Sequence, residues 1–542
     1  MEMKEAMVEV RDGANLATSV TLPGSTSYPA IIVRTVYGRS QLAVLGRIMS
    51  RFGYATVVQD VRGSGDSSGQ FGFLKQEPSD AIETAQWILS QPWCNGHLAI
   101  LGISYLSAAS IAIAVEFPEQ TKAAIWVTVP VSANTLLYDT GVLRLHHALP
   151  WVISLPWGLE SDASLNEFHP SMYEKVPLIH AVPPELNAPW TDMLEEGPTS
   201  SFWRENDLEH YVRECKVPGI HFGGWYDFLL DATLGPYQVM AKSGVPQRLI
   251  LGPWSHNGIV GNEKITGDIW HGCDKGRNGE VSLSSRFVQE SAEWLDYWMK
   301  GSGDLTSMAS VKVFYTGYEP HWEEEQFWPG PGSTLTAYLS KGRLCKDLDE
   351  IEASGGYDRY TYDPWNPTPT EGGAVWAFPE AGLEPGPCVS HIHSRGDVLV
   401  YDSESLEKPL RILGNPRVNL HASSSAPDTD FTAALFDVDP QGVSRYVADG
   451  ITRARYRKGF CAPEFLEPYQ TYLFQIDMKG CAHTFGPGHK LRLVIGSSNF
   501  PKFDRNPNMT EPIYQNPEME KATQTVRYGS QTPSKLLLPV LE

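Results

Sequence analysis

One stretch of the chain decides the fold that we expect: Leu98-Ala99-Ile100-Leu101-Gly102-Ile103-Ser104-Tyr105-Leu106-Ser107. Its apolar start predicts a buried strand, and the residues from Tyr105 onward predict a helix that begins at once. Between them, the Gly102-x-Ser104 turn would project the Ser104 hydroxyl above a sheet edge, in the manner of a nucleophile elbow. Such a strained turn needs small neighbours; Gly102 is one, whereas Leu106 stands where a second glycine is usual, and Ser107 follows. A serine that merely caps a helix gives the same local pattern. The rest of the chain therefore has to show whether Ser104 is a nucleophile or a helix cap.

Strand and helix patterns alternate on both sides of this stretch. Asp12-Gly13 predicts a hairpin, and continuous apolar runs predict strands buried on both faces. The expected strands are residues 6–10, 16–22, 30–33, 54–59, 98–101, 123–129, 217–221 and 248–251, and the expected helices are 42–51, 79–90, 105–116 and 286–300. Ser79 should cap the second helix, and Gly301 should end the last. This alternation predicts an α/β fold around a mostly parallel sheet with right-handed crossovers.

Two regions depart from the alternation. Residues 133–206 are rich in Leu, Trp, His and Pro, with helical patterns such as 140–147, and we interpret them as an insertion. From residue 329 the chain is rich in Pro and Gly, and its short strand patterns predict a sandwich or jelly roll. These patterns lie at 334–339, 397–401, 417–421, 431–437, 472–476 and 490–495. The expected domains are an α/β core of 1–132 and 207–328, a helical cap of 133–206 and a β domain of 329–542.

The composition limits the partners and the compartment. A formal net charge of −21 over 542 residues argues against nucleic acid and anionic membranes as partners. Seven cysteines are scattered singly without a CxxC pair, so we expect neither a disulfide framework nor a zinc site. The first residues lack the apolar core of a secretory signal, and no run of 18 apolar residues occurs. We expect a cytoplasmic protein without a membrane span, metal or organic cofactor, and we leave homo-oligomerisation open.

Two later loops supply the partners that a nucleophilic serine requires. The predicted strand at 217–221 leads into Gly223-Gly224-Trp225-Tyr226-Asp227-Phe228, and the strand at 248–251 leads into Gly252-Pro253-Trp254-Ser255-His256-Asn257-Gly258. Both loops follow presumed parallel strands, whose carboxyl ends carry the sites of α/β folds. The order Ser, Asp, His is the order of an α/β-hydrolase triad. We therefore predict that His256 is the base of Ser104 and that Asp227 orients the histidine.

The tetrahedral intermediate of such a reaction needs hydrogen-bond donors for its oxyanion. One donor is expected to be the backbone N–H of Tyr105, directly after the nucleophile. The other should come from the loop at 34–39, which follows the predicted strand at 30–33. There the Tyr37 phenol is a candidate, because a hydroxyl donates as well as a backbone amide.

Several motifs together resemble the CocE/NonD hydrolase family and its relatives, the X-Pro dipeptidyl-peptidases, α-amino acid ester hydrolases and glutaryl-cephalosporin acylases. They stand in the family's order and cover nearly the whole chain. The motifs are Arg34–Tyr37, Asp60-x-Arg62-Gly63-x-Gly65-x-Ser67-x-Gly69, Gln91-Pro92-Trp93-Cys94-Asn95-Gly96, Gly102-x-Ser104-Tyr105, Gly224-Trp225-Tyr226-Asp227, Gly252-Pro253-Trp254-x-His256, His489-Lys490-Leu491-Arg492-Leu493 and Ser497-Ser498-Asn499-Phe500-Pro501.

The resemblance implies an α/β-hydrolase core, an inserted helical cap and a C-terminal jelly-roll-like β domain. It implies the same triad, and a tyrosine side chain in the oxyanion hole at Tyr37. Ser107 departs from the family's usual glycine, and we expect the elbow to survive because serine is small. We interpret Asp60 and Arg62 as a buried ion pair that holds their loop beside the site.

The substrate pocket is expected between the core, the cap and the β domain. Trp151, Trp157 and Phe228 are candidate wall residues, together with His146, His147 and Phe168. An apolar, aromatic lining suits small acyl or aryl groups, so we predict a serine hydrolase that cleaves carboxylic esters through an acyl-enzyme. A free amino group would require carboxylates, for which the cap offers Glu160, Asp162, Glu195 and Glu196. Amide or peptide cleavage, acyl transfer or ring closure with the same triad, and an inactive binding protein remain as alternatives.

Overall fold

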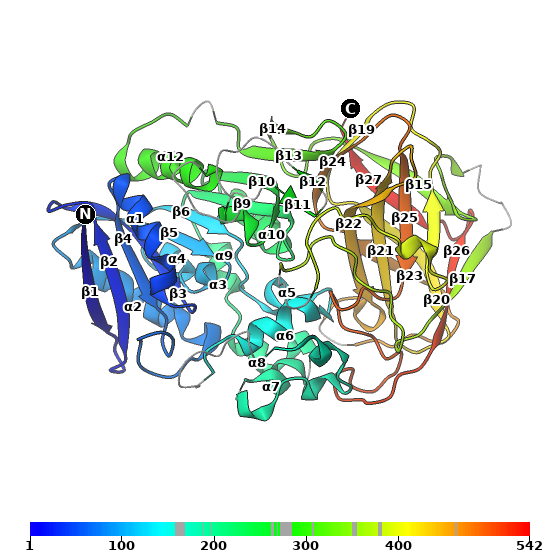
Figure 1. Ribbon diagram of the computed structural model, residues 1–542, viewed down its shortest axis with the longest axis horizontal. Coiled ribbons are helices and arrows are strands. Elements are labelled where there is room, and N and C mark those ends of the chain that lie inside the picture. The colour runs from blue at the N-terminus through cyan, green and yellow to red at the C-terminus, as the bar shows by residue number, and fades with distance from the viewer. Residues whose placement is uncertain are drawn as a thin grey trace.

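The computed structural model describes residues 1–541 apart from 158–167, 187, 196, 262–264, 268, 271–284, 306–307, 349–354, 378–381 and 461–462 (Figure 1). A continuous sheet runs through the N-terminal part in the spatial order β1-β2-β4-β3-β5-β6-β9-β10-β13-β14. Every pairing from β4 to β13 is parallel, and the flanking pairings are antiparallel. The strands are β1 Glu2–Glu9, β2 Asn15–Leu22, β3 Tyr28–Thr35, β4 Ala55–Asp60, β5 Cys94–Ile103, β6 Thr121–Val127, β9 Gly219–Tyr226, β10 Gln247–Ser255, β13 Val311–Gly317 and β14 His321–Glu325.

Helices pack against this sheet through their apolar sides. Helices α2, α4, α9 and α10 contact one another in a row, while α12 crosses β5, β6 and β9. The helices are α1 Ala43–Arg51, α2 Glu77–Leu89, α3 Tyr105–Ala108, α4 Ile111–Glu116, α9 Glu209–Glu214, α10 Asp231–Ala241, α11 Gly258–Gly261 and α12 Arg286–Lys300. Gly301 ends α12 in the left-handed conformation, with φ 66°, as its sequence position predicts.

Two helix predictions in the core need correction. Helix α2 begins at Glu77, and Ser79 does not cap it; its hydroxyl donates to the Gln76 carbonyl instead. Pro78 lies in the first turn, where a missing N–H costs nothing, and a tertiary ion pair holds Glu77. The helix predicted at 105–116 is two helices, α3 and α4, because the Ala109 carbonyl at their junction accepts a hydrogen bond from buried Arg34.

The segment after β6 forms the predicted helical insertion, which Figure 1 shows below the sheet. Its elements are α5 Ala133–Leu136, β7 Tyr138–Asp139, β8 Val142–Leu143, α6 Leu145–Ile153, α7 Trp190–Leu194 and α8 Ser201–Glu205. The helix predicted at 140–147 is wrong in its first part, because helix α6 begins only at Leu145. Thr140 and Gly141 both have positive φ, at 47° and 82°, and form the two-residue turn of a β7–β8 hairpin before α6 begins.

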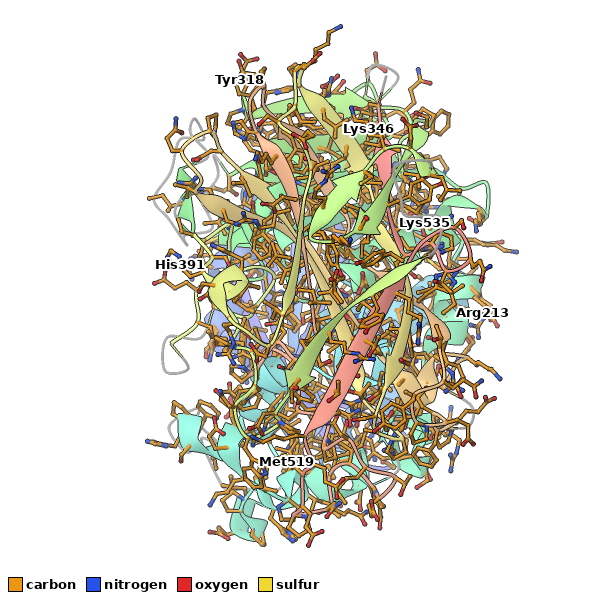
Figure 2. The ribbon with its side chains drawn as sticks, turned by 90° about the vertical axis from the view of Figure 1, so that its right-hand side faces the viewer. Arg213, Tyr318, Lys346, His391, Met519 and Lys535 are labelled. Atoms are coloured by element: carbon orange, nitrogen blue, oxygen red, sulfur yellow. The ribbon has the colours of Figure 1, made fainter. Side chains whose placement is uncertain are left out.

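The C-terminal part is an antiparallel β sandwich, seen from its outer side in Figure 2. Strands β18, β25, β21 and β22 pair in one layer, and β17, β26, β20, β27 and β15 pair in the other. The strands are β15 Ser333–Ser340, β16 Arg343–Cys345, β17 Gly356–Tyr362, β18 Leu399–Asp402, β19 Leu410–Gly414, β20 Arg417–Ser424, β21 Asp430–Val438, β22 Ser444–Arg453, β23 Tyr472–Asp477, β24 Cys481–Phe485, β25 Lys490–Gly496, β26 Ala522–Tyr528 and β27 Lys535–Val540. A buried apolar cluster with members from both layers, including Leu435, Leu493, Leu420 and Val526, fills the sandwich.

The sandwich is joined to the parallel sheet by hydrogen bonding. Strand β13 pairs with β10 on one side, and its end pairs with β24, where Thr316 faces His483. The predicted fold class is thereby confirmed, with an α/β core, a helical cap and a β domain. The domain bounds at 132, 206 and 328 stay predictions. Across the part of the chain that the structure describes, no helix is long and apolar enough to span a membrane.

Candidate active site

Ser104 occupies a strained turn between β5 and α3. Its φ of 55° and ψ of −124° lie in a region that non-glycine residues rarely adopt, at a typical cost of about 1–3 kcal/mol. The Ser104 N–H donates to the Val127 carbonyl at 2.7 Å and ties the turn to β6. A Cβ atom on Gly102 would lie 2.5 Å from Cα and Oγ of Ser107. The turn therefore requires glycine at 102, and serine at 107 is accommodated.

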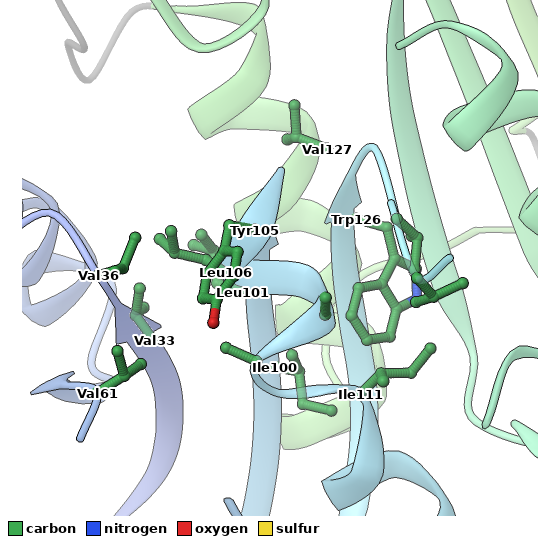
Figure 3. Close-up of a cluster of buried hydrophobic side chains, with 14 of the residues drawn as sticks. Val33, Val36, Val61, Ile100, Leu101, Tyr105, Leu106, Ile111, Trp126 and Val127 are labelled. Atoms are coloured by element: carbon green, nitrogen blue, oxygen red, sulfur yellow. The ribbon is translucent and has the colours of Figure 1, made fainter. Parts of the chain in front are cut away.

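A buried polar network beneath the turn fixes Tyr105. Arg34 donates from Nη1 to Glu77 Oε2 at 2.7 Å and to the Ala109 carbonyl at 2.6 Å, and the Tyr105 hydroxyl donates to Glu77 Oε1 at 2.8 Å. Burial raises the pKa of the Tyr105 phenol well above its usual value, so that phenol stays protonated. Apolar side chains such as Val33, Ile100 and Leu106 pack around the Tyr105 ring (Figure 3). The anchored side chain of Tyr105 therefore fixes the position of its backbone N–H.

The carboxyl ends of the adjacent strands β9 and β10 bring Asp227 and His256 together. His256 Nδ1 donates to Asp227 Oδ1 at 2.9 Å and lies 3.0 Å from Oδ2. The Leu229 N–H also donates to Asp227 Oδ1, at 2.8 Å, and the carboxylate is fully buried. Because Nδ1 carries the proton toward the carboxylate, His256 Nε2 is left with a free lone pair, as a general base requires.

Ser104 and His256 both line one cavity of about 1110 Å³. Its wall includes Tyr37 and Phe228 from the core, His147 and Trp151 from the cap, and Trp376 from the β domain. The described lining residues contain serines, one Gln and one Asn, but no Asp, Glu, Lys or Arg. The cavity is therefore suited to a neutral small molecule with aromatic or apolar parts.

Tyr37 lines this cavity next to Trp151. Its hydroxyl oxygen accepts a hydrogen bond from Trp151 Nε1 at 3.0 Å, which leaves the O–H free to donate to another acceptor. The shielding of the hydroxyl from solvent raises the pKa of Tyr37 to about 12, although 37% of the residue is exposed. The phenol is therefore a protonated donor throughout the neutral range.

Comparison with known proteins identifies the family. Residues 12–258 match the X-Pro dipeptidyl-peptidase (S15 family), and residues 295–537 match the X-Pro dipeptidyl-peptidase C-terminal non-catalytic domain. The chain is 30% identical to the cocaine esterase of Rhodococcus sp. (strain MB1 Bresler), over 99% of this chain and 98% of that enzyme. The chain belongs to the CocE/NonD hydrolase family.

Two solved structures share the fold of this CocE/NonD hydrolase. One is an aminopeptidase from the marine sediment archaeon Thaumarchaeota archaeon, with a TM-score of 0.87, and the other is an α-amino acid ester hydrolase, with a TM-score of 0.85. Each is 24% identical to this chain and covers all of it, with 96% of its own length matched. Membership of the family makes the chain a serine hydrolase.

The structure of this CocE/NonD hydrolase separates the predicted wall residues. Trp151, Phe228 and His147 line the cavity, whereas Trp157 is not among the described lining residues. Trp157 packs on the Phe71 ring at 5.1 Å and donates from Nε1 to the Val152 carbonyl, so it supports the wall from behind. His146 donates from Nε2 to the Trp376 carbonyl at 2.9 Å.

The other predicted residues lie away from the cavity or cannot be placed. Phe168 packs on Tyr173, and Glu195 is exposed at the end of α7. Glu160, Asp162 and Glu196 lie outside the described residues.

The loop after β4 departs from its prediction. Asp60 and Arg62 do not pair with each other, because each binds other charged residues. Asp60 is bound by Arg39, at 2.6 Å, and Arg62 is bound by Asp80, at 2.7 Å, and by Asp12. The interpretation of a single ion pair was therefore wrong: Arg39 holds the loop through Asp60 and Asp66, and Arg62 holds it through Asp80 and Asp12.

The sequence analysis missed several cavity residues, and Trp376 is an aromatic one among them. Trp376 belongs to the β domain and reaches the cavity across the domain boundary. Nothing in the local sequence Gly373-Ala374-Val375-Trp376 distinguishes it from the other tryptophans of the chain. Only the packing of the β domain against the cap reveals its place.

Proposed function

We propose that this CocE/NonD hydrolase cleaves carboxylic esters of small acyl or aryl compounds, with Ser104 as nucleophile. The observation that carries the proposal is one cavity shared by a strained serine and a histidine whose other nitrogen is bound by a buried carboxylate. A histidine oriented in this way serves as a general base, and the positive φ of Ser104 is typical of a nucleophile elbow.

The reaction has two halves. His256 Nε2 takes the Ser104 proton as Oγ attacks the ester carbonyl carbon, and Asp227 stabilises the imidazolium. The oxyanion accepts hydrogen bonds from the Tyr37 hydroxyl and the Tyr105 N–H, and the alcohol leaves with the proton from His256. Water, deprotonated by His256, then attacks the acyl-enzyme, and the acid is released as Ser104 regains its proton.

The lining favours esters over peptides with a free amino terminus. An α-ammonium group buried in a cavity requires a carboxylate partner, and the described lining residues contain none. The relative at 30% identity is named an esterase, which also supports this choice. The second candidate, amide cleavage, is supported by the X-Pro dipeptidyl-peptidase family that residues 12–258 match. Cytoplasmic location remains a prediction from the sequence, and homo-oligomerisation stays open.

A labelling experiment tests the proposal. The protein is treated with a fluorophosphonate and the adduct is located by mass spectrometry, while turnover of p-nitrophenyl acetate and of an X-Pro-p-nitroanilide is measured. Ser104→Ala should lose both the adduct and turnover. Ser79→Ala, an exposed serine on α2, serves as the matched control and should keep both.

Each outcome has a clear meaning. An adduct on Ser104 together with ester turnover supports the proposal. An adduct with anilide turnover alone would replace it by amide cleavage. A folded protein with neither adduct nor turnover would refute it. Product analysis with a competing alcohol separates hydrolysis from acyl transfer, because both share the acyl-enzyme.

A further inference from the structure

A second histidine, His147, stands in the wall of the cavity. It lies on α6 and is only 4% exposed, yet it is among the residues that line the space shared by Ser104 and His256. Three aromatic rings surround it: Phe228 at 4.2 Å, Trp151 at 5.4 Å in a stacked arrangement, and Trp376 at 5.7 Å edge-on. This aromatic subsite is formed by the core, the cap and the β domain together.

His147 differs from the other histidines near it in its hydrogen bonding. Neither of its ring nitrogens bonds to any residue that the structure describes, and Nδ1 is completely buried. His146, its neighbour, uses Nε2 for the Trp376 carbonyl and Nδ1 for the Tyr173 hydroxyl, and His256 is held by Asp227. Nδ1 is too deeply buried to meet a ligand, so a partner that arrives with the ligand can bond only Nε2, for which no described residue is a partner.

The surroundings of His147 keep the ring neutral and select its tautomer. Burial, with help from the nearby His256 and Arg144, lowers the pKa of His147 well below its usual value. A proton on Nδ1 would be a buried donor without an acceptor, whereas a proton on Nε2 leaves only a buried lone pair. The Nε2–H tautomer is therefore favoured, and Nε2, which is not fully buried, offers its proton to the cavity.

We propose that His147 positions the substrate by donating a hydrogen bond from Nε2 to a neutral oxygen on an aryl group that occupies the aromatic subsite. The inference rests on the proposed ester hydrolysis and names its substrate class: esters whose aryl part carries an ether, carbonyl or hydroxyl oxygen. Trp151, Phe228 and Trp376 bind the ring by stacking and edge contacts, and His147 supplies the polar contact. His147 is not the base, because it lacks the carboxylate that orients His256.

The test compares oxygen-bearing substrates with isosteric hydrocarbons. The kcat/KM of p-nitrophenyl 3-methoxybenzoate is divided by that of p-nitrophenyl 3-ethylbenzoate. The same ratio is measured for the 4-methoxybenzoate and the 4-ethylbenzoate. His147→Leu should lower this ratio about three- to tenfold in at least one pair, as expected for the loss of one hydrogen bond. His147→Gln, which keeps a donor, should retain more of the ratio than His147→Leu. Electronic effects of the substituents cancel when the ratios of two variants are compared.

A binding measurement separates this inference from the proposed function. The same esters are titrated against Ser104→Ala with and without His147→Leu, and the dissociation constants are determined by calorimetry. A preference for methoxy over ethyl that disappears with His147→Leu supports the inference even if the wild type hydrolyses no ester. If the methoxy-to-ethyl ratio of each pair is the same in all variants, in hydrolysis and in binding, the inference is overturned. Ester hydrolysis then still stands wherever turnover is observed.

Discussion

Replacing Asp227 by Asn tests how the carboxylate directs the proton of His256. In the structure, Asp227 Oδ1 accepts the Leu229 N–H at 2.8 Å and lies 2.9 Å from His256 Nδ1, and Oδ2 lies 3.0 Å from the same nitrogen. An asparagine keeps the Leu229 bond only with its carbonyl oxygen at the Oδ1 position. Its NH2 group then takes the Oδ2 position, 3.0 Å from Nδ1, where it would face a proton on Nδ1 but can donate to an Nδ1 lone pair. That contact favours the His256 tautomer with the proton on Nε2, which cannot accept the Ser104 proton.

The expected loss is large because the wrong tautomer disables the base itself. The same exchange in a serine triad with retained geometry costs about 10⁴ in kcat, which corresponds to about 5.5 kcal/mol at 1.36 kcal/mol per tenfold change. We expect a fall of about 10³ to 10⁴ in kcat/KM for p-nitrophenyl acetate, measured by stopped-flow or steady-state release of nitrophenolate.

Asp207→Asn provides the matched control. Asp207 makes the same kind of local bond, from the Glu209 N–H to Oδ1 at 2.8 Å, but it is exposed and is not near the cavity. This variant should keep wild-type activity. If Asp227→Asn is folded by circular dichroism and loses less than tenfold, the assignment of Asp227 as the orienting carboxylate is refuted.

Two further variants test the donors and the turn. Tyr37→Phe should lower kcat about 100-fold through the loss of an oxyanion donor, and an unchanged rate in this variant would assign the donor to a backbone amide. Because the pKa of Tyr37 is raised to about 12, deprotonation of this donor should not lower the wild-type rate until the pH approaches that value. Gly102→Ala should lower the midpoint of thermal unfolding, because the new Cβ atom would lie 2.5 Å from Ser107 Cα, a clash that costs about 1–3 kcal/mol. An unchanged midpoint would show that the turn can relax.

The core of the fold could be predicted because its signals are local. The buried strands of a parallel sheet are continuous apolar runs, and residues 30–33 and 98–101 are found within β3 and β5. The 286–300 prediction matches α12 at both ends, because Ser285 caps it and Gly301 ends it. These residues act through their own backbone, so the sequence alone reveals them.

The errors occurred where distant residues override local preference. Ser79 has the sequence pattern of an N-cap, but the helix starts two residues earlier, where Glu77 reaches Arg34 on β3. The 140–147 pattern is helical in its apolar spacing, yet Thr140 and Gly141 turn the chain into a hairpin that packs on the β domain, with the Thr140 hydroxyl bonded to the Ile451 carbonyl. Neither contact can be read from a local window.

The candidate site also combines residues that the sequence predicts with a residue that only the tertiary structure reveals. Ser104, Asp227 and His256 follow strands of the core in the expected order, and the structure brings Asp227 and His256 into hydrogen-bond contact. The role of each remains a prediction until the variants are measured. Trp376 could not have been predicted, because its approach to His147 depends on how two domains pack, and its own neighbours in sequence are unremarkable small and apolar residues.

The position of Trp376 also bears on the order in which the molecule is made. The ribosome synthesises Ser104, Asp227 and His256 well before Trp376, and domains commonly fold in that order. A nascent or proteolysed chain that ends before Trp376 carries the residues assigned to bond cleavage, but one wall of its cavity is missing. The wall of the cavity is thus complete only after the β domain has been synthesised.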